Sequence, residues 1–287
     1  MNKYLPLLLL LIVFPHFACS DETSAQAIME DESNPLMLLS TSLGEIYIEL
    51  FSDEAPENVA NFIALAQGRI EFNDPNSRNT FTPRYFDGMQ FHKVVPGMFI
   101  QAGSPQYHPL GSPKNLLNDE INADSLGLDN QPVMDDFGTF NPLLNISNRS
   151  SFQKELVDPI VSYLKISSES ELLERQYEIY DLIANLTLKR AYEIRGYQYS
   201  TNIATREINR SIVALANSGP NTNGPEFFIA TSDLPMLNGR HTVIGRVVEG
   251  METVDAIGKT EINPLNPSRF ATWIYALRNV ARWGSRK

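Results

Sequence analysis

Cysteine is almost missing from this chain of 287 residues, in which Cys19 is the only one. A single cysteine excludes an intramolecular disulfide, and it leaves the folded part of the chain without a thiolate metal site or a thiol nucleophile. Basic charge is also scarce, because 23 Lys and Arg face 34 Asp and Glu, for a net charge of −11. Nonspecific nucleic-acid binding depends on Lys and Arg meeting phosphates, so the composition argues against that class of function.

Sequence patterns that mark metal and cofactor sites are missing as well. The four histidines do not fall at metal-ligand spacing with one another or with carboxylates. The sequence has no serine-centred nucleophile elbow and no glycine-rich phosphate loop. We therefore expect a function that needs no metal and no cofactor.

Long apolar runs are confined to the N-terminus. Residues 5–14 form such a run behind the positive charge of Lys3, and the run is shorter than the about 20 residues that span a bilayer. This pattern predicts an export signal, with two processing sites left open. The first is a signal peptide over residues 1–27, cleaved after Ala25-Gln26-Ala27, and the second is a lipoprotein signal that ends before an acylated Cys19. Either one predicts a periplasmic or otherwise exported protein, and the second adds a lipid anchor in a membrane.

Most of the remaining chain has the pattern of a β-protein. Residues 28–36 are acidic and rich in small side chains, and we interpret them as a tether. Alternating apolar residues between Gly, Pro and Asn turns predict strands. These strands cover residues 37–40, 45–51, 91–95, 98–102, 212–216, 226–231 and 241–248. A helix is predicted to start at Pro56 and to end at Gly68. Together these elements favour a mainly β fold, a closed antiparallel β-barrel with capping helices.

Two further segments show helical spacing. Between residues 122 and 206, apolar side chains recur at intervals of three and four, which predicts an α-helical insertion in a loop of the barrel. Phe270, Trp273 and Leu277 keep the same spacing near the end of the chain, which predicts a C-terminal helix over residues 263–287. The barrel is therefore assigned to residues 37–121 and 207–262.

Two distant stretches, residues 91–103 and 215–228, share one kind of chemistry. Each mixes aromatic and Met side chains with hydrogen-bonding groups beside Gly and Pro turns. Such chemistry suits a shallow apolar slot that holds an extended peptide. With the segment Leu237-Asn238-Gly239-Arg240-His241, the two stretches resemble the cyclophilin family of peptidyl-prolyl isomerases. The resemblance implies a cyclophilin-like barrel and isomerase (rotamase) activity on X-Pro bonds.

The resemblance also implies a role for each matching residue. In this family an Arg that follows a Phe-His pair donates to the prolyl nitrogen, and here Lys93 occupies that place, preceded by His92. These two are the predicted catalytic residues. The predicted substrate-binding residues are Met98, Phe99, Gln101, Ala216, Asn217, Glu226, Phe228, Met236, Leu237 and His241. Glu226 stands where a Gln is usual, and Met236 stands where many members have a Trp.

These departures leave the function open between several readings. The first is a peptidyl-prolyl cis-trans isomerase that assists the folding of exported proteins by binding their extended X-Pro segments. The alternative is a proline-peptide-binding chaperone or scaffold with weak or no isomerase activity, because the flexible ammonium of Lys93 replaces the rigid fork of an Arg. A third reading is an assembly factor that works mainly through the insertion. The Glu226 carboxylate could hold Lys93 by pairing with it, or it could repel a substrate carbonyl. In each reading the expected partners are proline-containing segments of exported proteins.

Overall fold

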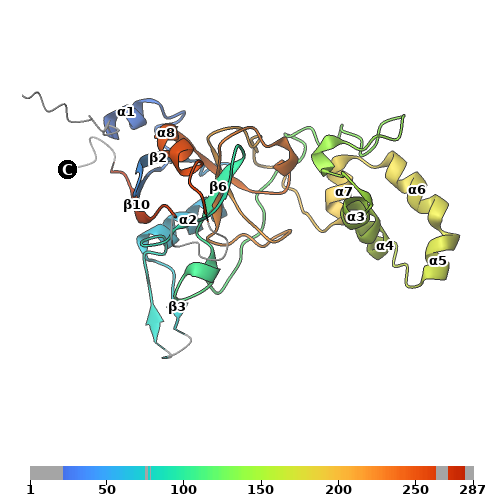
Figure 1. Ribbon diagram of the computed structural model, residues 1–287, viewed down its shortest axis with the longest axis horizontal. Helices are drawn as coiled ribbons and strands as arrows, with labels where there is room; N and C mark the ends of the chain where they lie inside the picture. The colour runs from blue at the N-terminus through green and yellow to red at the C-terminus, as the bar shows by residue number, and fades with distance from the viewer. Residues whose placement is uncertain (1–21, 75–76, 78, 263–270, 282–287) are drawn as a thin grey trace, which may run out of the picture.

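The computed structural model of the chain describes residues 22–74, 77, 79–262 and 271–281. Its main body is a curled β-sheet, and a lobe of helices projects from one end of this body along the longest axis (Figure 1). Within the described ranges, no helix has both the length and the apolar character needed to cross a membrane.

Eight strands form one antiparallel sheet. Their order across the sheet is β10-β1-β2-β9-β7-β8-β6-β5. The strands are β1 (Leu36–Thr41), β2 (Gly44–Leu50), β5 (Phe91–Val95), β6 (Phe99–Ala102), β7 (Ile212–Leu215), β8 (Phe227–Ala230), β9 (Val243–Glu249) and β10 (Ile274–Asn279). A separate hairpin joins β3 (Phe72–Asn73) to β4 (Thr80–Phe81). Strands from both halves of the chain therefore alternate in the sheet, which brings the two distant stretches side by side.

The sheet curls into a half-barrel, and the predicted closure is not confirmed. The outermost strands β5 and β10 share no ladder. Their ends meet only through an isolated bridge between Gln90 and Trp273 and neighbouring backbone hydrogen bonds. The alternation of apolar residues predicts a mainly antiparallel β fold. Closure into a barrel depends in addition on how closely the outer strands β5 and β10 approach each other.

The inside of the half-barrel is an apolar core that two helices cover. Helix α2 (Pro56–Gln67) buries Val59, Phe62 and Leu65, and helix α8 (Met251–Ile257) adds its own buried side chains. The ring of Phe62 lies 5.4 Å from that of Phe227 at an interplanar angle of 84°, an edge-to-face contact. As predicted, Gly68 ends α2, and its φ of 70° is the left-handed conformation that a glycine adopts at low cost.

The segment before β1 is packed on the body, so the predicted tether over residues 28–36 is wrong. Helix α1 (Glu22–Ala27) buries Ala25 completely beside Leu36 and Tyr47. The chain that follows wraps around the carboxylate of Glu49, which is 0 % exposed and accepts the backbone N–H of Glu30 at 3.1 Å. Burial raises the pKa of Glu49, but hydrogen bonds from this segment and from Arg246 lower it below its usual value. A buried carboxylate needs such donors, and this need fixes the segment in place.

The end of the chain forms strand β10, so the predicted C-terminal helix is wrong over the described residues 271–281. Ile274 pairs with Thr41 and Ala276 pairs with Ser40, which leaves Tyr275 as an extra residue in a β-bulge. The bulge shifts the alternation by one residue, so Ile274 and Leu277 both face the core at 0 % exposure. Their spacing of three suggested a helix, and the bulge gives the same spacing in a strand. The rest of the predicted helix lies outside the described residues.

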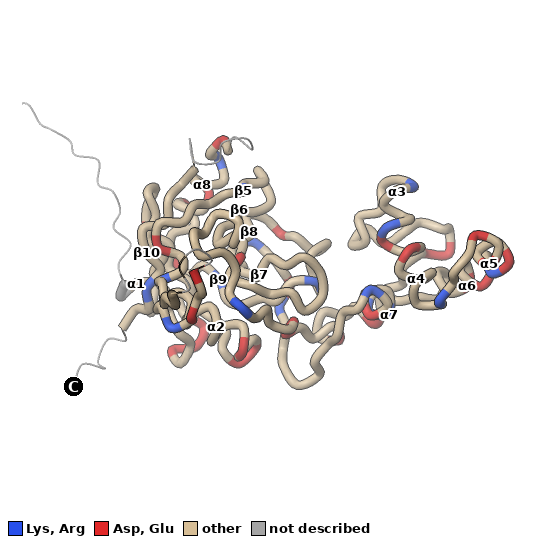
Figure 2. Tube along the Cα trace, turned by 90° about the horizontal axis from the view of Figure 1, so that it is seen from below, with Lys and Arg blue, Asp and Glu red and all other residues tan. Residues whose placement is uncertain are grey.

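The insertion between β6 and β7 has a core of its own. Its elements are η2 (Pro142–Leu144), α3 (Arg149–Phe152), the π-helix η3 (Gln153–Val157), α4 (Asp158–Tyr163), α5 (Glu169–Glu174), α6 (Gln176–Asn185) and α7 (Leu188–Ile194). Leu128, Leu156, Ile183 and Tyr192 are among its buried side chains, and this cluster is separate from the core of the half-barrel. Figure 2 shows the resulting lobe standing apart from the sheet except at its neck. We call residues 122–206 the helical lobe.

Candidate functional site

A β-bulge in β5 places the two predicted catalytic residues on the outer face of the sheet. Phe91 pairs with Ala102 and Lys93 pairs with Gln101, so His92 is the extra residue on β5. Phe91 points into the core and is fully buried. Because strict alternation would turn either His92 or Lys93 inward, the bulge is what lets both side chains reach the face that carries Gln101.

Glu226 is the centre of a polar network on this face. Its Oε1 atom lies 2.9 Å from His92 Nε2 and accepts a hydrogen bond of 2.6 Å from Gln101 Nε2. Burial raises the pKa of Glu226, but these two hydrogen bonds and the charge of Lys93 outweigh burial, so that its pKa lies below the usual value. The carboxylate is therefore ionised at neutral pH, and the His92 tautomer that suits it carries its proton on Nε2.

Lys93 does not pair with Glu226. Its ammonium lies 5.3 Å from the centre of the Phe99 ring, in cation–π contact, and the residue is exposed. Within the part of the chain that the structure describes, no carboxylate lies within ion-pair distance of this ammonium. Since Glu226 is engaged by other donors, the three donors of Lys93 are available to a ligand that sits on Phe99.

The apolar side chains predicted for the slot gather around Phe228. The ring of Phe99 lies 5.4 Å from that of Phe228, which is 3 % exposed. Met98, Phe99, Ala216, Met236 and Leu237 are partly buried around a floor that includes Ala214, Phe228 and Val243. This cluster lies on the opposite side of the sheet from the core of the half-barrel. The structure thus brings every apolar side chain predicted for the slot into one patch.

His241 closes one side of this patch. Its ring meets Phe228 edge-on at 5.4 Å and 90°, and its Nδ1 lies 3.0 Å from the carbonyl oxygen of Leu215. A carbonyl can only accept, so Nδ1 carries the proton. Burial, which outweighs the hydrogen bond to Leu215, lowers the pKa of His241 to about 4. The ring is therefore neutral at neutral pH and acts as an apolar wall with a fixed orientation.

Asn217 has a different place from the other predicted residues. Its side-chain amide donates to the carbonyl oxygen of Arg240 at 2.9 Å, and its Oδ1 accepts from the backbone N–H of Gly219 at 3.3 Å. The side chain thus holds two loops together, and a peptide contact from Asn217 would have to come from its backbone. Arg240 was not predicted to have a role, although its position directly before His241 in the matched segment could have indicated one.

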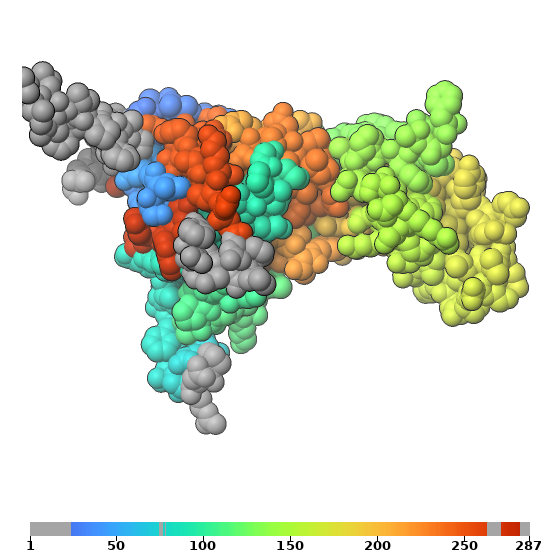
Figure 3. All heavy atoms as spheres, in the orientation of Figure 1, coloured from blue at the N-terminus to red at the C-terminus, as the bar shows by residue number. Residues whose placement is uncertain are grey.

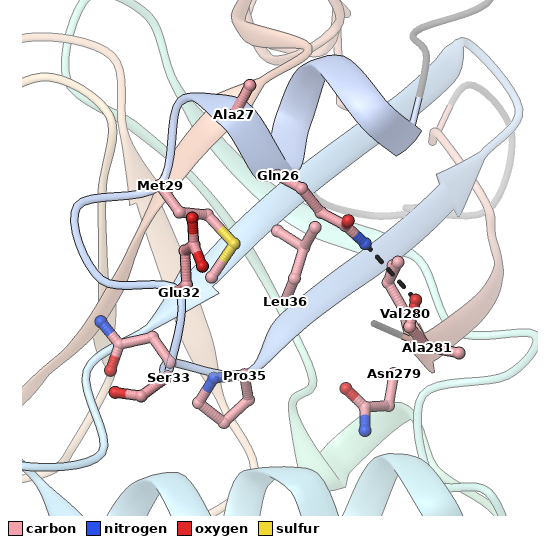
Figure 4. A pocket seen from close by; sticks show the side chains of 11 residues that line it. Gln26, Ala27, Met29, Glu32, Ser33, Pro35, Leu36, Asn279, Val280 and Ala281 are labelled. Atoms are coloured by element: carbon pink, nitrogen blue, oxygen red, sulfur yellow. Dashed lines mark hydrogen bonds between the residues drawn. The ribbon is translucent and has the colours of Figure 1, made fainter. Parts of the chain in front are cut away.

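A hollow in the described surface lies away from this patch. A cavity of about 720 Å³ opens between the segment after α1 and the end of β10 (Figure 4). It is lined by Gln26, Ala27, Met29, Glu32, Ser33, Asn34, Pro35, Leu36, Asn279, Val280 and Ala281. None of these is a predicted site residue. Among the described residues, no three His, Cys, Asp or Glu side chains are arranged to hold a metal ion.

Comparisons with known proteins give the family of this chain. The family model for "Cyclophilin type peptidyl-prolyl cis-trans isomerase/CLD" matches residues 36–272. Peptidyl-prolyl cis-trans isomerase A of Mycobacterium tuberculosis is 27 % identical over 224 residues, which are 77 % of this chain and 79 % of the relative. Peptidyl-prolyl cis-trans isomerase B of Streptomyces anulatus is 27 % identical over 228 residues, covering 79 % of this chain and 85 % of the relative. A crystal structure of a Cryptosporidium parvum cyclophilin type isomerase superposes with a TM-score of 0.49 at 18 % identity, over 87 % of this chain and 99 % of that one.

Proposed function

Because this chain belongs to the cyclophilin type peptidyl-prolyl cis-trans isomerase family, we propose that it catalyses the cis-trans isomerisation of X-Pro bonds in extended segments of exported proteins. The observation that carries the proposal is the position of the Lys93 ammonium over the Phe99 ring, beside the patch around Phe228. A proline ring seated on this patch would have its nitrogen within reach of a cation that the described residues leave without an ion pair.

The chemistry needs no more than this arrangement. The barrier to rotation about the peptide bond, about 18–20 kcal/mol, comes from amide resonance. As the bond twists, the lone pair localises on the prolyl nitrogen, and a donor aimed at that atom stabilises the twisted state more than the planar one. Only such a differential interaction accelerates the reaction. A hydrogen bond from a charged donor is worth about 1.5–3 kcal/mol, which corresponds to roughly 10- to 150-fold in rate.

The polar network beside Lys93 supports the same mechanism. The Glu226 carboxylate is held by His92 and Gln101, and its charge lies near enough to Lys93 for the two to influence each other. The Glu226 carboxylate is hydrogen-bonded to His92 and Gln101, and within the described residues it forms no ion pair with Lys93, which supports a role for the ammonium at the substrate. Gln101 and His92 then act as positioning groups for Glu226, and Lys93 is the group that reaches the substrate.

Measurement of cis-trans exchange in an X-Pro peptide by NMR tests the proposal. Wild-type protein is expected to accelerate exchange, and Lys93→Ala is expected to lose roughly 10- to 150-fold of the catalysed rate. Lys154→Ala, which removes an exposed lysine of the helical lobe, serves as the matched control and should keep the wild-type rate. If wild type binds the peptide without accelerating exchange while Lys93→Arg gains activity, the protein is a proline-peptide-binding chaperone or scaffold and the isomerase proposal is wrong.

For the export route, we propose that processing occurs before Cys19 and that the mature protein is lipid-anchored. Cleavage after Ala27 would remove helix α1, whose Ala25 is completely buried in the apolar cluster with Leu36 and Tyr47. Cleavage before Cys19 keeps this helix in the mature chain. Mass spectrometry of the mature N-terminus should find an acylated Cys19, and Cys19→Ser should abolish the acyl mass. A mature chain that begins at Ile28 would refute this proposal.

A further inference from the structure

The helical lobe meets the half-barrel at the loop that carries one wall of the slot. This loop runs through η4 (Pro235–Leu237) to His241, and it supplies Met236 and Leu237 to the apolar patch. On the face shown in Figure 3, the green atoms of the lobe adjoin the orange atoms of the body at this end of the molecule. We call residues 234–241 the wall loop.

Two close contacts join the lobe to the middle of the wall loop. The hydroxyl of Tyr199 donates to the carbonyl oxygen of Gly239 at 2.9 Å. Burial raises the pKa of Tyr199, so this hydroxyl remains a donor at neutral pH. Gly239 has a φ of 76°, and a Cβ atom there would lie 2.4 Å from Leu128 Cδ1 of the lobe. The lobe therefore touches the loop backbone directly, and any side chain at position 239 would have to displace Leu128.

The side chain of Arg240 ties the same loop to the lobe a second time. Its guanidinium bonds to the carbonyl oxygen of Met236, lies 5.6 Å from the centre of the Tyr192 ring and has Glu155 at 4.0 Å. Tyr192 and Glu155 both belong to the lobe. Arg240 thus connects the backbone of a slot residue to an aromatic face and a carboxylate of the insertion.

We propose that the helical lobe is a positioning device that fixes the wall loop and so sets the width and order of the proline slot, with Tyr199 and Arg240 as the positioning residues. This inference rests on the proposed function of the slot. It assigns the insertion an internal role at the site, because a loop held on its outer side by the lobe is ordered before the substrate arrives. Ordering a loop in advance lowers the entropic cost of binding.

The expected consequence is a change in binding and not in the chemical step. Met236 and Leu237 would contact the proline ring equally in the planar and twisted states, and loss of such uniform binding raises KM while leaving kcat unchanged. Tyr199→Phe removes a single hydrogen bond, so KM should rise about 2- to 10-fold with kcat within about two-fold of wild type. Tyr163→Phe is the matched control, because its hydroxyl accepts a hydrogen bond from Arg190 inside the lobe and has no other hydrogen-bond partner among the described residues.

The test combines exchange kinetics with methyl NMR of ¹³C-labelled methionine on the full-length chain. The Met236 methyl resonance should move in Tyr199→Phe and stay in place in Tyr163→Phe, while Met98 on the other part of the slot serves as an internal reference. The peptide Kd from the same titration should weaken together with KM. The inference is overturned if Tyr199→Phe matches Tyr163→Phe in the Met236 resonance, or if the resonance moves without any loss of peptide affinity. Absence of catalysis in wild type would refute the proposed function alone, since the resonance and the Kd still decide on the lobe.

Discussion

Acid should lower the stability of this protein through one partly buried histidine, His241. The neutral ring of His241 packs on Phe228 and donates from Nδ1 to the carbonyl oxygen of Leu215. Burial lowers the pKa of His241 from 6.5 to about 4 in the folded chain. Protonation would place a charge in the apolar side of the slot, so the folded state resists it more strongly than the unfolded chain does.

The sign and size of the effect follow from proton linkage. Between about pH 6.5 and pH 4 the unfolded chain binds a proton at this position and the folded chain does not, so the free energy of unfolding falls as the pH falls. The stabilising contribution is fully present above the unfolded pKa. It is lost progressively down to the folded pKa of about 4. A difference of about 2.5 pKa units, at 1.36 kcal/mol each, gives a loss of about 3 kcal/mol.

Urea denaturation of wild type and His241→Asn at pH 7 and pH 4 measures this contribution. The Asn amide can still donate to Leu215 but does not titrate, so its loss of ring packing is the same at both pH values. All other titrating groups are shared, and their contributions cancel in the comparison. Wild type should lose about 3 kcal/mol more than the variant between the two pH values. Parallel losses in the two proteins would show that His241 is not desolvated in the folded chain and would refute the reasoning.

Three further substitutions test other parts of the structure. Glu226→Leu removes the acceptor for two partly buried donors, His92 and Gln101, and should lower the free energy of unfolding in urea by about 1–3 kcal/mol. Glu226→Gln keeps an acceptor oxygen and should cost less, so equal costs would contradict the network. Leu277→Ala should lower the free energy of unfolding by about 2–5 kcal/mol, because this side chain is 0 % exposed. Tyr275→Ala, at a side chain that is 63 % exposed, should change it by no more than about 0.5 kcal/mol. Similar costs for the two variants would place the bulge of β10 elsewhere. Gly103→Ala should lower both the melting temperature and kcat/KM. The new Cβ atom would lie 2.4 Å from the Pro225 carbonyl oxygen, and the residue has a φ of 85°. An unchanged kcat/KM would show that the turn at Gly103 does not affect the candidate site.

Much of the half-barrel could be predicted because its signals are local. In β2 the apolar residues Ile46, Ile48 and Leu50 occupy alternate positions, and the pleat of a strand turns all three into the core of the half-barrel. Gly68 ends α2 because a glycine adopts the left-handed conformation at low cost. The apolar side chains that the family resemblance implies for the slot were named from the sequence, because the motifs that carry the resemblance are continuous stretches of the chain. The structure gathers them around Phe228 as one patch.

The wrong predictions share one cause, which is that the deciding contact lies far away in the sequence. The segment after α1 reads as a tether by composition, yet it is fixed because the buried carboxylate of Glu49 needs its N–H donors. The spacing of apolar residues over 271–281 predicts a helix, yet this segment is a strand because it pairs with β1, with a bulge at Tyr275.

The order of amino acids already specifies which chemical groups the candidate site has: a cation at Lys93, a carboxylate at Glu226 and apolar side chains that include Phe228. How these groups are paired depends on the folded chain. The bulge at His92 turns two consecutive side chains to one face, the carboxylate takes its hydrogen bonds from neighbours other than Lys93, and the lobe holds the loop beside Gly239. The register of a strand and the desolvation of a side chain both depend on which residues lie next to them in space. The sequence pattern of one segment does not show which distant residues these are.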